Sequence, residues 1–199
     1  MLMNRLEIAL MNNPIRAAVQ RRFEAVRLLA LGGRLDGGVA LEVGCGRGVG
    51  AEIILEHFGA ARVDAFDLDP RMVALARRRL ARRAERVRLW VGDVEKIDAP
   101  DTSYDAVFDF GILHHVPDWR AALREIHRVL KPGGRLYAEE LLAHVVQHRL
   151  WRRLLKHPQE DRFDAEGFRR GLEETPFEVR ATRTLAGVFA WYVAERPAA

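Results

Sequence analysis

Cysteine is almost absent from this 199-residue chain, which contains only one, Cys45. A single cysteine excludes an intramolecular disulfide and any metal site built from several cysteine ligands. The sequence also lacks an apolar run near the ~20 residues of a transmembrane helix. Its first ten residues alternate polar and apolar and lack the apolar core of a signal peptide. From these absences we expect a cytoplasmic protein.

The composition is that of a folded protein. Apolar residues make up 49% of the chain and charged residues 30%, which is typical of globular and not of disordered sequences. The length suffices for one domain with a real core. The formal net charge is only +4, although the calculated pI is about 9.7. This balance permits contact with nucleic acid or anionic lipid without requiring it, and we expect no nucleic-acid partner.

The rest of the chain is organised around residues 39–48, in which an apolar run ends in three alternate glycines, Gly44, Gly46 and Gly48. The pattern predicts a buried strand that turns sharply into a helix over about residues 49–58. Glycines at these positions let the backbone turn tightly and approach a ligand closely. A glycine-rich turn alone is a weak signal, and an ordinary strand–helix turn would look similar.

Glu42 is the unusual residue of this stretch, because it lies inside the apolar run. A carboxylate in a buried strand is costly unless it meets a hydrogen-bond donor. We therefore expect Glu42 to face a ligand or the amides of the loop, and a purely capping role is the alternative.

Strands and helices alternate through the middle of the chain. Further strands are predicted at residues 62–67, 87–91, 105–110 and 135–141, with helices beginning after Asp69 and Asp118 as N-caps. This alternation predicts a parallel sheet with helices on both faces. Right-handed crossovers then place a ligand at the carboxyl ends of the strands.

The two ends of the chain differ from the middle. Residues 2–31 look helical with a break at Asn12-Asn13-Pro14, and Phe23, Val26, Leu29 and Ala30 recur at helical spacing. Residues 143–157 predict a basic amphipathic helix, and residues 165–174 a helix capped by Asp164. Residues 178–185 and 188–195 read as two strands whose short connection requires antiparallel pairing.

Five features then lie in one order along residues 36–142. They are EVGCGRG at 42–48, Asp67 ending the second strand, Gly92-Asp93 ending the third, SYDAVF at 103–108 and LKPGGRL at 130–136. Together they resemble the class I S-adenosylmethionine-dependent methyltransferases, most of all the small-molecule branch that includes quinone-biosynthesis methyltransferases.

The resemblance implies a fold and an organisation. The fold would be α/β, Rossmann-like and doubly wound, with three α/β/α layers and a seven-stranded, mostly parallel sheet whose last strand is antiparallel. The whole chain, 1–199, would form one methyltransferase domain. Within it, residues 1–35 would be a helical lid, 36–142 the cofactor-binding core, 143–175 a helical segment and 176–199 a terminal β-hairpin.

The resemblance also implies S-adenosyl-L-methionine as cofactor. Asp67 would accept hydrogen bonds from both ribose hydroxyls, and Asp93 from the adenine amino group, with the Val94 amide nearby. Loop capping is the alternative for both aspartates. The residues expected to contact the cofactor are Glu42, Gly44, Cys45, Gly46, Asp67, Leu68, Asp93, Val94 and Phe110.

Methyl transfer from this cofactor is an in-line displacement, so the protein mostly supplies alignment. A general base is needed only if the acceptor arrives protonated. Our candidates for catalytic residues are His115, Glu140 and Asp109, with His114 beside them. Glu139 should point to the opposite face of its strand from Glu140. We predict no metal, because neighbouring histidines cannot easily face one ion.

Several alternatives stay open. A nicotinamide-dependent Rossmann oxidoreductase also uses a glycine loop and a strand-end acid, but the spacing of the glycines and the closing hairpin argue against it. A methyltransferase acting on RNA or protein is a second alternative. The acceptor is not fixed by the sequence, and neither is the oligomeric state, monomer or homodimer.

Two segments are candidates for covering the substrate. The N-terminal helices offer Asn12, Asn13, Arg16 and Gln20 as polar groups that could grip a ligand. The basic helix over residues 143–156 could instead make a peripheral contact with an anionic membrane. Arg47 stands where smaller residues are frequent in the family, and we expect it to lie outside the cofactor site.

Overall fold

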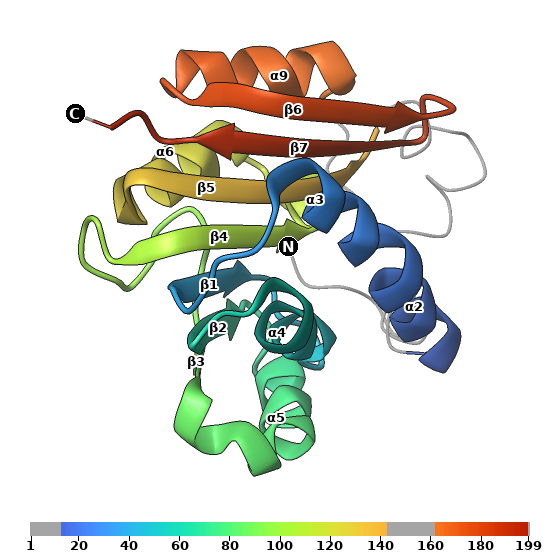
Figure 1. Cartoon of the computed structure of the whole chain (residues 1–199), viewed down its shortest axis with the longest axis vertical. Coiled ribbons are helices and arrows are strands. Elements are labelled where there is room, and N and C mark those ends of the chain that lie inside the picture. Colours follow the sequence, from blue (N-terminus) through green and yellow to red (C-terminus); the bar gives the residue numbers. More distant parts are fainter. Residues whose placement is uncertain (1–12, 143–161, 199) are drawn as a thin grey trace.

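The computed structural model describes residues 13–142 and 162–198, and these form a seven-stranded sheet covered by helices on both faces (Figure 1). The strands are β1 (Val39–Val43), β2 (Arg62–Asp67), β3 (Val87–Val91), β4 (Tyr104–Phe110), β5 (Leu130–Leu141), β6 (Glu178–Leu185) and β7 (Phe189–Glu195). The helices are α2 (Pro14–Val19), α3 (Ala25–Gly32), α4 (Val49–Ile53), α5 (Pro70–Arg79), α6 (Trp119–Val129) and α9 (Ala165–Glu174). Short π segments at Gln20–Glu24 and Ile54–Phe58 and 3₁₀ turns at Ala81–Arg86 and Leu113–His115 complete the described helical structure.

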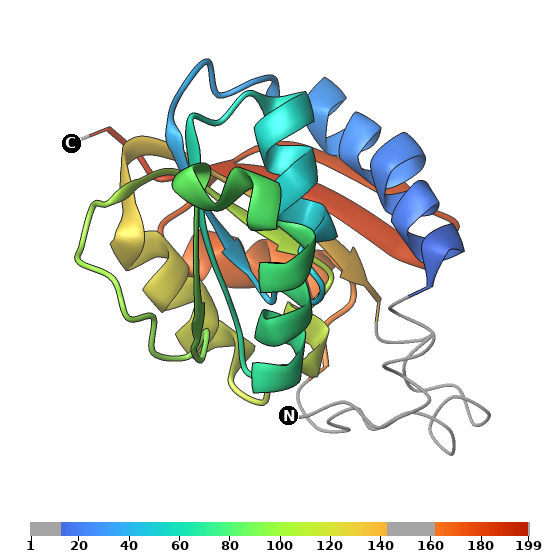
Figure 2. The same cartoon turned by 90° about the horizontal axis from the view of Figure 1, so that it is seen from below.

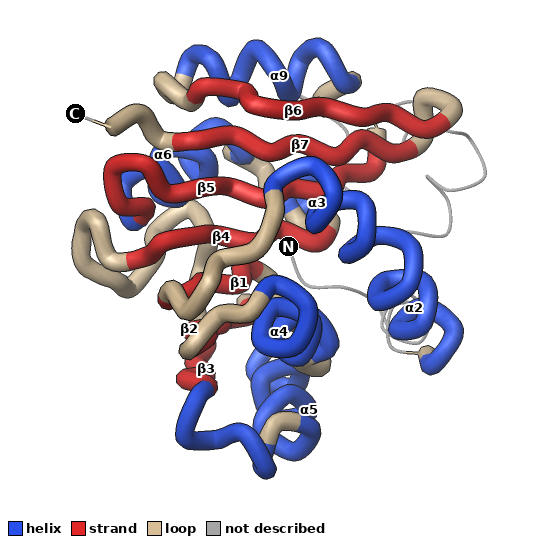
Figure 3. The backbone as a smooth tube through the Cα atoms, in the orientation of Figure 1, coloured by secondary structure: helices blue, strands red, loops and turns tan. Residues whose placement is uncertain are grey.

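The strand order is β3-β2-β1-β4-β5-β7-β6, and only β7 runs antiparallel to its neighbours. This confirms the predicted Rossmann-like sheet with its antiparallel strand. The order reverses between β1 and β4, which are adjacent in space although two strands separate them in the sequence. Figure 3 shows β4 beside β1. Because β1, β2, β3 and β4 pair in parallel, their carboxyl ends lie along one edge of the sheet.

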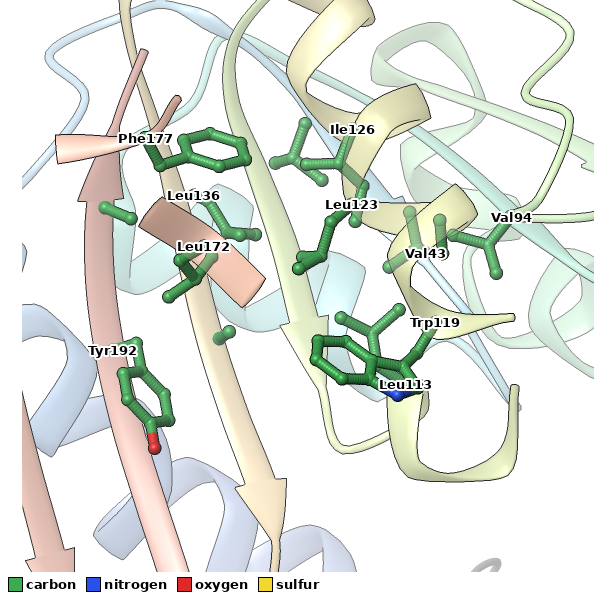
Figure 4. Close-up of a cluster of buried hydrophobic side chains, with 14 of the residues drawn as sticks. Val43, Val94, Leu113, Trp119, Leu123, Ile126, Leu136, Leu172, Phe177 and Tyr192 are labelled. Carbon is green, nitrogen blue, oxygen red and sulfur yellow. The ribbon is translucent and has the colours of Figure 1, made fainter. Parts of the chain in front are cut away.

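Each face of the sheet carries its own apolar layer. Helices α3, α4 and α5 pack on one face with Leu28, Ile54 and Phe58 in the interior, and α6 and α9 cover the other face (Figures 1 and 2). Figure 4 shows part of the second layer, a cluster that contains Trp119 and Leu123 of α6, Leu172 of α9 and Tyr192 of β7. Burial on both faces explains why the central strands read as nearly continuous apolar runs.

The helix starts agree with their sequence signals. Asn13, Asp69, Asp118 and Asp164 each accept a hydrogen bond from a backbone N–H of the first turn that follows. Proline occupies the first position after two of these caps, where its missing N–H costs nothing. The antiparallel pairing of β6 and β7 confirms the predicted hairpin.

Two sequence predictions were wrong in detail. Strand β5 begins at Leu130 and not at residue 135, because Leu130 already pairs with Tyr104 and Gly133 N–H bonds to the Arg196 carbonyl.

In the N-terminal helix, Val26 is 50% exposed, whereas Leu28 is buried. The π segment at Gln20–Glu24 inserts an extra residue into the helical period, so the buried face turns away from the predicted one. The predicted helix at 143–157 lies outside the described residues.

Candidate active site

A cavity of about 280 Å³ lies at the carboxyl ends of β1 to β4. Its wall is formed by Arg16, Ala17, Gln20, Glu42, Gly44, Cys45, Gly46, Arg47, Val49, Gly50, Phe66, Asp67, Leu68, Gly92, Asp93, Val94, Glu95, Phe110, Gly111, Ile112, His115, Val116 and Pro117. All nine residues expected to contact a cofactor lie on this one wall. The sequence alone could suggest this grouping because parallel strands end at the same edge.

The glycine loop is shaped by close approach. Gly44 has φ +71°, and a Cβ there would lie 2.5 Å from the Ile112 side chain. Gly50, in the first turn of α4, leaves room for Glu42, because a Cβ would lie 1.9 Å from Glu42 Oε1. Larger residues at these two positions would displace the loop, the Ile112 wall or the Glu42 carboxyl.

Glu42 is buried beneath the loop and faces the start of α4. Burial and the neighbouring charge of Asp67 raise its pKa well above the ordinary value, although the Ala51 N–H hydrogen-bonds to the carboxyl and lowers it. Its Oε2 is buried without a hydrogen-bond partner among the described residues. Glu42 therefore presents an unsatisfied polar atom next to the cavity, where a ligand donor would stabilise it.

Asp67, at the end of β2, ties the glycine loop to the next turn. Its Oδ2 accepts the Gly46 N–H and its Oδ1 the Asp69 N–H, each at 2.9 Å. Burial raises the pKa of this carboxyl, and the two amides offset part of the effect. The loop-capping alternative is thus realised, and each oxygen keeps a further lone pair for a ligand hydroxyl.

The end of β3 forms the next part of the wall. Asp93 Oδ1 accepts the Glu95 N–H at 3.0 Å, which shapes the turn, and Val94 is buried beside it. Leu68 is 42% exposed and lines the cavity. An apolar ligand surface would cover it.

The opposite wall comes from the N-terminal helix, whose Arg16, Ala17 and Gln20 line the cavity. Arg47 also lines it, against our expectation, and its Nη2 donates to the Asn13 carbonyl at 2.9 Å. Sequence reasoning missed Ala17 and Arg47 as wall residues. The position of Ala17 follows from long-range packing of the helix, for which no local sequence signal exists, whereas Arg47 is part of the glycine loop and lines the cavity with it.

Of the three candidates for proton transfer, only His115 lines the cavity. Asp109 and Glu140 are fully buried behind the wall, together with His114. Glu140 Oε2 lies 2.6 Å from His114 Nδ1, and the rings of His114 and His115 are 4.2 Å apart. Among the described residues no group of three His, Cys, Asp or Glu side chains could hold a metal ion, and the metal-free chemistry stays a prediction.

Comparisons with known proteins agree with this geometry. Residues 41–138 match the family model described as a methyltransferase domain. The chain is 40% identical over 119 residues to a ubiquinone biosynthesis O-methyltransferase of Xanthomonas oryzae pv. oryzae, a match that covers 58% of this chain and 49% of the relative. It is 34% identical over 131 residues to a malonyl-[acyl-carrier protein] O-methyltransferase of Serratia marcescens, covering 66% and 49%. The chain thus spans about half the length of the curated relatives it matches.

The fold comparison extends over nearly the whole chain. A SAM-dependent methyltransferase from Aquifex aeolicus superposes with a TM-score of 0.77 at 21% identity, over 97% of this chain and 98% of the other. No helix in the described part of the chain has the length and apolar character needed to cross a bilayer. The strand order, the loop at the end of β1 and the matched model leave no place for the nicotinamide-dependent alternative. The chain belongs to the class I S-adenosylmethionine-dependent methyltransferases, with S-adenosylmethionine as the methyl donor of the family.

Proposed function

We propose that the protein transfers the methyl group of S-adenosylmethionine to an oxygen atom of a small-molecule acceptor. The observation that carries this proposal is the position of His115 on the wall of a cavity that is also lined by the glycine loop and the N-terminal helix. Its volume is near the lower end of the range for small-molecule sites. A polymer would need an open groove in place of this helix.

The residues on the wall fit the cofactor. The orphaned Glu42 Oε2 suits a donor such as the ammonium group of the cofactor's amino acid. Asp67 suits two neighbouring ribose hydroxyls, since one carboxylate can accept from both. Asp93 and the buried Val94 form the edge at which an adenine ring would lie, and Gly44, Cys45 and Gly46 pass beneath the remainder.

When bound, S-adenosylmethionine supplies an electrophilic methyl group on a sulfonium, transferred by in-line displacement. The chain then has to align the acceptor and to remove its proton if it has one. His115 is the imidazole on the wall, and a neutral imidazole has one nitrogen that can accept a proton. The apolar side chains of Phe110, Ile112 and Val116 around it would exclude water.

An oxygen acceptor is supported by the relatives, because both named matches are O-methyltransferases. A hydroxyl of a phenol or catechol needs a base for efficient attack, which gives His115 a task. A carboxyl group would arrive already ionised, and His115 would then only orient it.

The test uses purified full-length protein with methyl-labelled S-adenosylmethionine and a panel of catechols, phenols and small carboxylic acids. We expect label in a small product, and loss of most turnover in His115→Gln with little change in affinity for S-adenosylhomocysteine. Label found only in added RNA or protein would support the alternative of a macromolecular acceptor. Binding of neither S-adenosylmethionine nor S-adenosylhomocysteine in calorimetry would remove the proposal altogether.

A further inference from the structure

Two acids that the sequence places in the site, Asp109 and Glu140, are both fully buried and do not line the cavity. They come from neighbouring parallel strands, with Asp109 on β4 and Glu140 on β5. Two carboxyl groups side by side without solvent are costly when both are ionised. Their place in the fold therefore needs an explanation other than contact with substrate.

Their partners form a continuous set. Asp109 Oδ1 accepts the Ile112 N–H at 2.8 Å, Glu140 Oε1 the Leu113 N–H at 2.8 Å, and Glu140 Oε2 the His114 N–H at 3.3 Å. Three consecutive amides of the segment after β4 thus end on two buried carboxyl groups. The cavity wall includes the residue before these amides, Gly111, and the three residues after them, His115, Val116 and Pro117.

The same segment is held from its other side. Arg162, which precedes α9, donates from Nη1 to the His114 carbonyl at 2.5 Å and from Nη2 to the Val116 carbonyl at 3.1 Å. The N–H groups of the segment therefore bond to Asp109 and Glu140, and two of its carbonyl groups bond to Arg162. Residues 112–116 are consequently fixed in both directions without regular secondary structure beyond the single turn Leu113–His115.

The donors show where the proton of the pair resides. Both oxygens of Glu140 accept a backbone N–H, and Oε2 also lies 2.6 Å from His114 Nδ1. Asp109 Oδ2, in contrast, is buried and accepts no hydrogen bond from any described residue. A carboxylate is stabilised by donors and a carboxylic acid by an acceptor. One proton on Asp109 Oδ2, donated to Glu140, satisfies both groups.

The pKa directions agree with this arrangement. Burial and then the neighbouring Glu140 raise the pKa of Asp109 well above its ordinary value. Burial raises the pKa of Glu140 to about 7, and the hydrogen bond from Asp109 and the amides limit the rise. Of the two groups, Asp109 therefore holds its proton more tightly.

We propose that Asp109 and Glu140 form a singly protonated pair, with the proton on Asp109 and the charge on Glu140. Through the amides of residues 112–114 and the ring of His114, this pair positions the cavity wall at residues 111–117, which includes the His115 ring. The inference rests on the proposed function in one respect: that function supplies the reason why residues 112–116, with His115 among them, need a fixed position. Glu140 is a positioning residue and not a base, because its oxygens are occupied by donors and screened from the cavity.

A tautomer follows from the proposal. His114 is neutral, since burial lowers its pKa to about 4. A neutral imidazole carries one proton, and an ionised Glu140 requires it on Nδ1. The ring of His114 then lies against that of His115, 4.2 Å between centroids, and carries the influence of Glu140 to the cavity wall.

The first test needs no substitution. Nitrogen-15 NMR of the imidazoles at pH 8 distinguishes the two neutral tautomers of His114. We expect the proton on Nδ1, with slow exchange of the Ile112, Leu113 and His114 amides. A proton on Nε2 would overturn the proposal, whether or not any variant folds.

The second test compares three variants by the imidazole titration of His115. Asp109→Asn reproduces a protonated acid, since its amide can donate to Glu140 and accept from Ile112, so the His115 pKa should stay unchanged. Glu140→Gln removes the negative charge and should lower the His115 pKa by about 0.5 unit or more. Glu139→Gln is the matched control, because Glu139 is also buried but contacts Trp191 and Arg16 on the opposite face of β5 and not the segment 112–116, so it should leave the titration unchanged.

Other charged groups near His115 stay constant across these variants. Asp93 and Glu95 line the same cavity, Arg16 and Arg47 face it from the other wall, and Arg162 bonds to the carbonyls on either side of His115. If Asp109→Asn lowered the His115 pKa as much as Glu140→Gln does, the proton would have been assigned to the wrong carboxyl group. An unchanged His115 titration in Glu140→Gln would refute the positioning role. Both measurements use free protein, so failure to bind S-adenosylhomocysteine would affect the proposed function alone.

Discussion

Glu139 and Glu140 are consecutive on β5, and their carboxyl groups lie on opposite faces of the sheet with unrelated partners. Glu139 Oε2 accepts the Trp191 Nε1 hydrogen at 2.5 Å, and its Oε1 lies 3.9 Å from Arg16 Nη2 of the N-terminal helix. Glu140 binds the segment after β4 on the other side. Strand alternation places both acids within the core, and each fixes one wall of the cavity. One dipeptide thereby connects the helix over the site to the segment that carries His115.

Asp67 and Asp69 lie two residues apart but should respond differently to substitution. Asp67→Ala removes the acceptor for the Gly46 N–H and the proposed acceptor for a ribose hydroxyl, so we expect at least about tenfold weaker binding of S-adenosylhomocysteine, since a hydrogen bond to a charged group contributes roughly 1.5–3 kcal/mol. Asp69→Ala removes the α5 cap and should cost ~0.5–2 kcal/mol of unfolding free energy with little loss of affinity. Calorimetry and urea denaturation measure the two effects, and equal losses of affinity would show that the wrong aspartate is assigned.

The pH dependence of stability should report on His114. Its pKa of about 4 in the folded protein is below the ordinary value of 6.5. The unfolded chain therefore binds more protons between these values, and the contribution of His114 is complete above pH 6.5 and is lost as pH falls toward 4. Its size is on the order of 1–3 kcal/mol. The difference in unfolding free energy between wild type and His114→Asn should shrink from pH 7.5 to pH 5.0, and it should stay constant between pH 7.5 and 8.5. A difference that grows on acidification contradicts the buried neutral histidine.

Cys45 should be unreactive although it lines the cavity. Burial and then the charges of Glu42 and Asp67 raise the pKa of its thiol, so the reactive thiolate is suppressed, and the side chain is only 3% exposed. We expect alkylation by iodoacetamide at pH 8 at least about tenfold slower in the native protein than in urea, and slower still with S-adenosylhomocysteine bound. Equal rates in the native and unfolded protein would mean that the loop opens freely.

Local signals predicted much of the fold. The caps at Asp69, Asp118 and Asp164 and the glycine loop depend on a few consecutive residues, so the sequence contains all that determines them. The strand ends were predictable as a group because parallel topology brings them to one edge. The exposure of Val26 was not predictable. The buried face of a helix is predicted from the 3.6-residue period of its apolar residues, and the π segment before Val26 interrupts that period.

The catalytic candidates show the limit of reading a strand end. Alternation indicates that Asp109 and Glu140 leave the sheet on particular faces, but it does not distinguish a side chain that opens to the cavity from one that turns under the next loop. Whether these side chains reach the cavity depends on the path of residues 111–117. Tertiary contacts set that path, namely the bonds from Arg162 to its carbonyls and the bonds from its amides to the two acids. The part of the cavity wall formed by Arg16, Ala17 and Gln20 depends likewise on where a distant helix packs.

The last prediction concerns the helix over the cavity. Three sets of contacts fasten it to the rest of the protein: Arg47 to the Asn13 carbonyl, Arg16 to Glu139 of β5, and Arg21 to Glu52 of α4 and Glu56 of the π segment Ile54–Phe58. The first of these joins the start of α2 directly to the glycine loop. We predict that Arg47→Ala leaves the sheet intact but loosens α2, because the helix begins at that contact. Closure of such a cover excludes water and completes the site.

The measurement is limited proteolysis of the full chain together with calorimetry. Arg47→Ala should be cleaved faster within Pro14–Val19 than wild type, bind S-adenosylhomocysteine about three- to tenfold more weakly, and regain protection at saturating ligand, because bound ligand stabilises the closed form by mass action. Arg22→Ala is the control, since Arg22 is exposed on the same helix and does not line the cavity. If cleavage is equally slow in both variants and independent of ligand, the helix is a fixed wall and not a lid. A truncation that removes residues 1–20 is an independent test. It should lower turnover and weaken binding of S-adenosylhomocysteine if the helix is a lid, and leave the affinity unchanged if the helix only packs on the sheet.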